Sequence, residues 1–147
     1  MSLRFWLATS IVLALAQPAF AGDADCNYIE IAATKSDKAA MDPELKPLEK
    51  KLKKAPFSAW NTFKKLSAGT VSLTKNKQES IRLKHGSASL MLRDRTEKRV
   101  ELTITKDDEK GKRVLEAKPA LKVADYLIVG GPGGSDDAGH MLALTCK

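Results

Sequence analysis

ESIRLKHGSASLMLRDRTEKRVELTIT, residues 79–105, alternates apolar and polar side chains through three consecutive segments. Alternation of this kind places every second side chain on one face, so it predicts three half-buried β-strands. His85 and Gly86 mark the turn between the first two strands, and residues 107–111 supply a turn after the third. The predicted inward-facing side chains are Ile81, Leu83, Leu90, Leu92, Val100, Leu102 and Ile104.

Further strand patterns lie on both sides of this stretch. CNYIEIAAT, residues 26–34, sets Ile29, Ile31 and Ala33 against Tyr28 and Glu30, which predicts a strand with one buried face. The other strand patterns are WNTFKKL (60–66), TVSL (70–73), KRVLEAKPAL (112–121), DYLIVGG (125–131) and HMLALTC (140–146). Roughly seven or eight short strands at a spacing of about 8 to 12 residues favour an antiparallel β-sandwich or open barrel. The predicted fold is therefore mainly β (α+β).

One short basic helix is predicted after the first strand, between residues 42 and 55. Asp42 is a suitable N-cap with Pro43 at the first helical position, although Pro47 leaves the exact start open. The spacing i, i+3, i+7 predicts one buried side, formed by Leu45, Leu48 and Leu52.

Lysines occupy most of the remaining positions of this helix, namely Lys46, Lys50, Lys51, Lys53 and Lys54. A cluster of this kind can attract an acidic envelope polymer or an acidic protein through its summed field. The alternative is an ordinary solvated face, balanced by Glu44 and Glu49. Both interpretations remain open at this stage.

The beginning of the chain has the plan of a signal peptide. Arg4 precedes an uncharged run over residues 5–16, and Ala19-Phe20-Ala21 offers a cleavage site after Ala21. The apolar run is too short to span a membrane. We therefore expect residues 1–21 to be removed, which leaves one β-rich domain over residues 22–147 that is periplasmic or secreted.

Cys26 and Cys146 are the two cysteines of the chain. In an exported protein a disulfide between them is the natural interpretation, and two free thiols are the alternative. Without Arg4, 24 basic residues face 18 acidic ones, a net charge of +6. A positive balance suits an acidic partner, whereas nucleic acid is an improbable partner for an exported protein even though Trp60 and Phe63 lie near the lysines.

Catalytic and cofactor motifs are missing from the sequence. His85 and His140 are not spaced as metal ligands, and Ser87 next to His85 does not make a nucleophilic triad without a carboxylate in a cleft. GGPGGSDDAG, residues 130–139, carries glycines and two aspartates but neither a phosphate-binding lysine nor calcium-loop spacing. We expect this loop to connect the last two strands, and we expect no enzyme, metal or cofactor.

The order YIEIAAT, DPELKPLEKKLKKAPFSAWNTFKKL, LIVGGP and LALTC resembles small exported bacterial proteins, myxobacterial ones among them. The resemblance covers residues 28–146 and implies that the mature chain is one domain. It implies no functional residue. The function predicted from the sequence is non-catalytic binding through the lysine-rich helix, and the alternative is a structural part of an envelope or secretion assembly that acts through strand edges or surface contacts.

Overall fold

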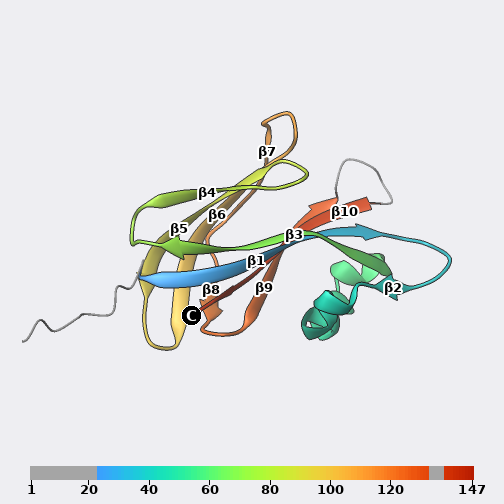
Figure 1. The fold of residues 1–147 in the computed structure, drawn as a ribbon, viewed down its shortest axis with the longest axis horizontal. Coiled ribbons are helices and arrows are strands. Elements are labelled where there is room, and N and C mark those ends of the chain that lie inside the picture. Colours follow the sequence, from blue (N-terminus) through green and yellow to red (C-terminus); the bar gives the residue numbers. More distant parts are fainter. Residues whose placement is uncertain (1–22, 133–137) are drawn as a thin grey trace, which may run out of the picture.

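The computed structural model describes residues 23–132 and 138–147, which fold into two β-sheets and a short helical segment (Figure 1). The predicted signal peptide lies outside the described residues, as do residues 133–137 of the glycine-rich loop. No helix within the described ranges is long and apolar enough to cross a membrane.

The first sheet, sheet A, has the order β2-β3-β1-β10-β9. Its neighbours are antiparallel except for β2 and β3, which run parallel. The strands are β1 (Ala24–Thr34), β2 (Ala40–Met41), β3 (Thr62–Leu73), β9 (Tyr126–Pro132) and β10 (Ala138–Cys146).

The second sheet, sheet B, has the order β4-β5-β6-β7, and β8 also pairs with β6. All of these pairs are antiparallel. The strands are β4 (Gln78–Arg82), β5 (Ser87–Arg95), β6 (Arg99–Asp107), β7 (Arg113–Ala117) and β8 (Ala120–Lys122). The predicted mainly β fold is therefore confirmed, and the two sheets fit the expected β-sandwich or open barrel, with ten described strands in place of seven or eight.

The strand count differs from the prediction because of local chain geometry. The two patterns at residues 60–66 and 70–73 join into the single long strand β3. Pro119 interrupts the predicted strand at 112–121 between β7 and β8, since proline has no N–H to continue the ladder. The two-residue strand β2 carried no alternating pattern in the sequence.

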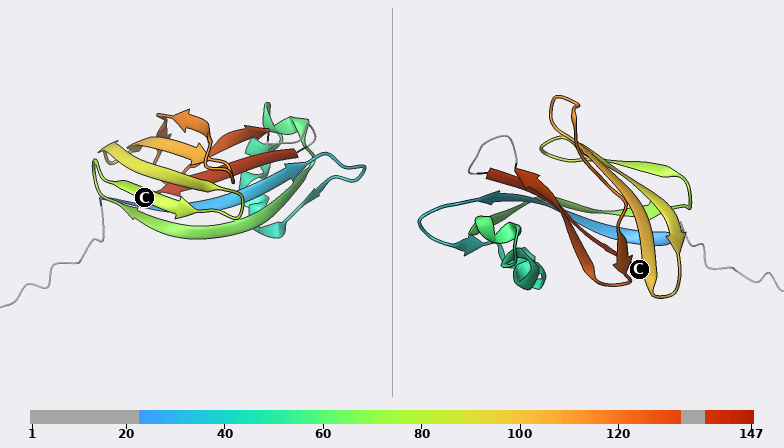
Figure 2. Two further views of the ribbon diagram at one scale, coloured as in Figure 1. Left: turned by 90° about the horizontal axis from the view of Figure 1, so that it is seen from above. Right: turned by 180° about the vertical axis from the view of Figure 1, so that it is seen from behind.

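Sheet A is covered on both faces. Toward sheet B, a core forms from apolar side chains of both sheets, including Cys26, Leu73, Leu90, Leu102 and Leu144. On the opposite face, side chains of sheet A pack against the helical segment, which lies under one end of the sheet in Figure 2. The prediction that the first strand buries only one face is therefore wrong.

The helical segment comprises η1 (Pro43–Leu48), a 3₁₀-helix, followed directly by one turn of α-helix, α1 (Glu49–Leu52), and a second 3₁₀ turn, η2 (Phe57–Ala59). Asp42 takes the predicted N-cap position, but its side-chain Oδ2 accepts a hydrogen bond from the Lys65 amide at 2.8 Å instead of capping η1. Pro47 lies inside η1. Proline removes one donor from the regular α-helical ladder, which explains why only the end of the predicted helix is α-helical.

Candidate anion-binding segment and buried polar cluster

The helical segment is attached to sheet A by its apolar side. Leu45, Leu48 and Leu52 each have no exposed surface. They pack in one cluster with side chains of sheet A, among them Ile31 and Phe63. The predicted buried side is thus confirmed, and because these leucines face the sheet, the remaining positions of the segment face solvent.

We call Lys46, Lys50, Lys51, Lys53 and Lys54 the lysine face. Lys51 is half-buried and the other four are exposed. Lys51 Nζ lies 3.5 Å from Asp125 Oδ1, and Lys53 Nζ lies 2.7 Å from Glu49 Oε1. Within the described residues the other three lysines form no ion pair, so the lysine face retains uncompensated positive charge.

Glu49 is the carboxylate that the lysine face holds most closely. The hydrogen bond and the charge of Lys53 lower the pKa of Glu49, and the charge of Lys46 adds to this effect. Glu49 is therefore ionised at neutral pH. Its negative charge offsets the charge of Lys53, and the rest of the lysine face stays cationic.

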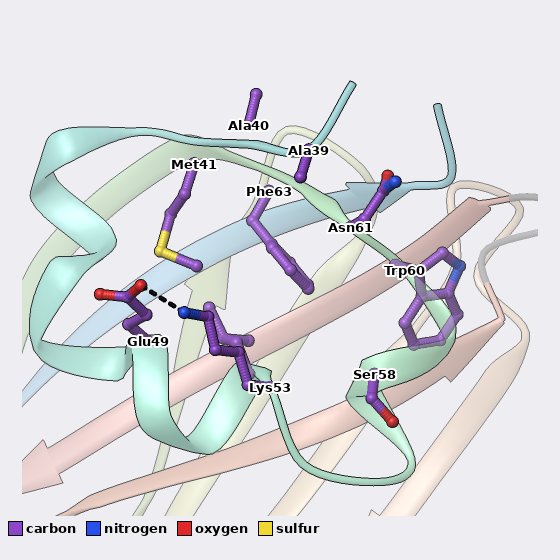
Figure 3. Close-up of a pocket in the computed structure, with 10 residues that line it drawn as sticks. Ala39, Ala40, Met41, Glu49, Lys53, Ser58, Trp60, Asn61 and Phe63 are labelled. Carbon is purple, nitrogen blue, oxygen red and sulfur yellow. Dashed lines mark hydrogen bonds and ion pairs between the residues drawn. The ribbon is translucent and has the colours of Figure 1, made fainter. Parts of the chain in front are cut away.

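A groove of about 430 Å³ opens beside the lysine face, between the helical segment and the β2–β3 edge of sheet A (Figure 3). Its apolar lining comes mainly from Met41, Leu52, Trp60 and Phe63. The Glu49–Lys53 pair lies at one side of this groove and Trp60 at the other. A groove of this size falls within the range of small-molecule sites.

The two aromatic residues near the lysines do not form a base-stacking platform. Phe63 is only 4% exposed and belongs to the core beneath the helical segment. Trp60 is half-buried, and its ring packs so closely on Gly139 that a Cβ there would overlap it. Only part of the Trp60 ring is therefore available to a ligand.

The sequence analysis missed a polar cluster buried between the two sheets. Glu30 on β1 has no exposed surface, and its carboxylate accepts four hydrogen bonds. The donors are Ser67 Oγ at 2.7 Å, the Lys84 amide at 2.8 Å, the His85 amide at 3.0 Å and His140 Nε2 at 2.7 Å. One side chain thus ties the β4–β5 turn of sheet B to β3 and β10 of sheet A.

The ionisation of this cluster follows from burial and hydrogen bonding together. Burial alone would raise the pKa of Glu30, but the four hydrogen bonds outweigh it and hold the pKa below its usual value. Burial lowers the pKa of His140 against the opposing pull of Glu30. At neutral pH the pair is therefore a carboxylate that accepts a hydrogen bond from a neutral imidazole.

Lys106 on β6 completes the buried cluster. It is 6% exposed, and its Nζ donates a hydrogen bond to the His140 carbonyl oxygen at 3.4 Å. Burial lowers the pKa of Lys106, and the charge of Glu30 opposes that shift. Glu30 therefore provides the negative charge that compensates a buried cation.

His85 lies in the turn between β4 and β5, and Ser87 begins β5. Both side chains are exposed, and His85 Nδ1 lies 2.5 Å from Glu109 Oε1, with no hydrogen bond between His85 and Ser87 among the described contacts. The His85 ring also contacts the His140 ring edge-on, with the ring centroids 5.8 Å apart. Residues 23–132 and 138–147 hold no group of three His, Cys, Asp or Glu side chains arranged for a metal ion.

The predicted disulfide is confirmed. Cys26 and Cys146 are bonded across 120 residues and face each other directly in the antiparallel β1–β10 register. The bond therefore links the two ends of the described chain at one end of the β1–β10 pair of sheet A.

Comparisons of the chain with protein-family models, with curated proteins and with solved structures found no match. The resemblance to small exported bacterial proteins stays a prediction.

Proposed function

We propose that this protein is an exported, non-catalytic binding domain that holds an acidic envelope polymer or an acidic protein on its lysine face. The disulfide and the lack of a membrane-spanning helix among the described residues are compatible with a periplasmic or secreted location. Removal of residues 1–21 as a signal peptide belongs to the same proposal.

The observation that carries the proposal is the orientation of the helical segment. Its three leucines are fully buried, so the five lysines are held on the solvent side of a fixed scaffold. Lys46, Lys50 and Lys54 have no carboxylate partner among the described residues. Because the buried leucines anchor the backbone of the segment, these unpaired cations are presented together to a polyanion.

Heparin-column retention across a salt series tests this proposal. We expect strong retention of the wild type that falls steeply with salt, because exposed charges are screened over about 8 Å at physiological ionic strength. The triple variant Lys46→Gln, Lys50→Gln, Lys54→Gln should elute at much lower salt.

A matched triple variant controls for net charge. Lys110, Lys112 and Lys118 are also exposed, without an ion pair in the described chain, and lie around β7 in sheet B. Their replacement by glutamine removes the same charge and should leave most of the retention intact. Equal losses in the two triple variants would show that only net charge matters and would refute a localised site.

The second candidate function is a structural role in an envelope or secretion assembly. The observation that favours it is Val114, a large hydrophobic residue that is 52% exposed on the edge strand β7. Edge strands with exposed apolar side chains can pair with another chain. This function predicts oligomers whose size increases with protein concentration. Val114→Lys should abolish these oligomers, and the triple variant of the lysine face should leave them unchanged.

A further inference from the structure

The groove beside the lysine face has the lining of a site for an apolar chain. Met41 and Trp60 are half-buried and give the groove its accessible apolar surface, and the core residues Phe63 and Leu52 line it with little or no exposed surface of their own. Methionine adapts to irregular shapes, and tryptophan offers a large apolar surface at low entropic cost. The groove therefore suits a flexible hydrocarbon better than a flat polar ring.

The polar groups of the groove support the same conclusion. Asn61 is already engaged, because its Oδ1 accepts the Ser36 amide at 2.9 Å and its Nδ2 donates to the Ser36 carbonyl oxygen at 2.7 Å. Ser58 remains as a small hydroxyl at the surface. Sugars and polyols need several free donors and acceptors, and this lining offers few.

One side of the groove carries the charge that an acidic group would need. Lys53 Nζ, bonded to Glu49 at 2.7 Å, has two further N–H donors. Lys53 is the lysine of the lysine face that lines the groove. Figure 3 shows the Lys53 amine directed toward Glu49, with Phe63 and Trp60 on the other side of the Lys53 side chain.

We propose that the groove binds a free single-chain anionic amphiphile, that is, one hydrocarbon chain ending in a carboxylate or phosphate. The chain lies on Met41 and Trp60, and the acidic group contacts Lys53. This inference goes beyond the proposed function, because a free amphiphile is neither an acidic polymer nor an acidic protein. It adds an apolar contact that a purely polyanionic ligand does not need.

Tryptophan fluorescence tests the inference directly. The chain has two tryptophans, and Trp6→Phe leaves Trp60 as the only emitting indole. We expect titration with dodecanoate below its micelle concentration to shift the Trp60 emission to shorter wavelength in a saturable way. Dodecyltrimethylammonium, which has the same chain and the opposite charge, should bind at least about threefold more weakly, as expected when an exposed ion pair is lost.

Two variants, both made in the Trp6→Phe background, separate the chain from the acidic group. Ala39 is exposed and lines the groove, so Ala39→Leu fills part of it without touching the core and should abolish the spectral shift. Lys53→Gln should weaken dodecanoate about threefold and leave dodecanol unchanged. Unchanged thermal unfolding of both variants would show that the fold is intact.

The outcomes distinguish this inference from the proposed function. If heparin retention depends on Lys46, Lys50 and Lys54 but dodecanoate gives no saturable shift, the lysine face binds polyanions and the groove inference is refuted. A shift that occurs only with anionic phospholipid vesicles, or one that Ala39→Leu leaves unchanged, also refutes it. A saturable shift that Ala39→Leu removes supports it, even if heparin does not bind.

Discussion

Replacing Glu30 with glutamine should destabilise the fold far more than a surface Glu→Gln change. The two oxygens of Glu30 have different partners: Oε1 accepts Ser67 and Lys84, and Oε2 accepts the His85 amide and His140. Glutamine can keep the first pair of bonds. Its amide nitrogen would take the place of Oε2 and meet the His85 N–H, which is a donor facing a donor.

The magnitude follows from these contacts. Hydrogen bonds to a charged acceptor contribute about 1.5–3 kcal/mol each, and a buried donor left unpaired costs about 1–3 kcal/mol. The His85 amide loses its partner, and the bonds that remain lose the assistance of a full charge. Lys106 also loses the carboxylate that opposes the effect of its burial. We expect Glu30→Gln to lower the free energy of unfolding by about 3 kcal/mol, a large share of the 5–15 kcal/mol typical of a domain.

The effect should depend on pH in a defined direction. The pKa of Glu30 is lower in the folded protein than its usual value of 4.5, so the charged carboxylate stabilises the fold above that pH. This stabilisation is lost as the pH falls below 4.5 toward the folded-state pKa. His140, whose pKa is also lowered from 6.5, adds a loss of wild-type stability as the pH falls below 6.5, because the unfolded chain takes up a proton first.

Urea unfolding of wild type and Glu30→Gln between about pH 8 and pH 3 measures both the size and the direction of the effect. Glu97→Gln is the matched control, because Glu97 is exposed and forms no ion pair within the described residues. The difference between wild type and Glu30→Gln should be largest near neutral pH and shrink in acid. A difference below about 1 kcal/mol at neutral pH, or one that does not change with pH, would refute the role given to this carboxylate.

Three further perturbations test other parts of the structure. The double variant Cys26→Ser, Cys146→Ser removes a crosslink over 120 residues, and urea unfolding should show that the free energy of unfolding falls by about 4–5 kcal/mol. Unchanged stability of the wild type in the presence of a reductant would contradict this prediction. Leu48→Ala opens a cavity beneath the lysine face and should lower the free energy of unfolding by about 2–5 kcal/mol, whereas Lys50→Ala should change it by less than about 0.5 kcal/mol. Equal effects of the two variants in thermal unfolding would place the helical segment outside the core. Gly86 has φ 98°, and a Cβ at this position would overlap a backbone carbonyl of β6. Gly86→Ala should therefore lower the free energy of unfolding by more than about 1 kcal/mol and weaken hydrogen-exchange protection in the β4–β5 turn. Unchanged protection would argue against that packing.

The alternation of apolar and polar residues correctly predicted the strands over residues 79–105 and their buried side chains. Ile81 and Leu83 are 5% and 6% exposed, and Leu90, Leu92, Val100, Leu102 and Ile104 have no exposed surface, as expected for inward-facing positions. The pairing of Cys26 with Cys146 was also predictable, because only two cysteines are present.

The arrangement of sheet A and the role of Glu30 could not be predicted in this way. Alternation tells which side chains share a face, but not whether a second layer covers that face. Glu30 shares its face with Cys26 and Tyr28, and it is buried because sheet B, contributed by a distant part of the chain, covers it. Its donors come from residues 37 to 110 positions away in the sequence. A charged residue in an alternating strand normally faces solvent, and the sequence pattern did not indicate that Glu30 is an exception.

Sheet A also separates the Glu30 cluster from the lysine face. On β1, Glu30 points to the core between the sheets, and its neighbour Ile31 points to the core beneath the helical segment. A register shift in the β1–β3 pairing falls between these two residues, and a β-bulge of this kind re-aims side chains locally. The Glu30 cluster links the two sheets, and the disulfide joins β1 to β10 within sheet A, whereas the lysine face and its groove depend on the leucine contacts on the other side. Local opening of the helical segment therefore need not open the sandwich, because it leaves the disulfide, the Glu30 hydrogen bonds and the ladders of sheet B in place. A ligand that contacts Lys53 of the helical segment and Met41 on β2 together would therefore stabilise the layer that neither the Glu30 cluster nor the disulfide holds.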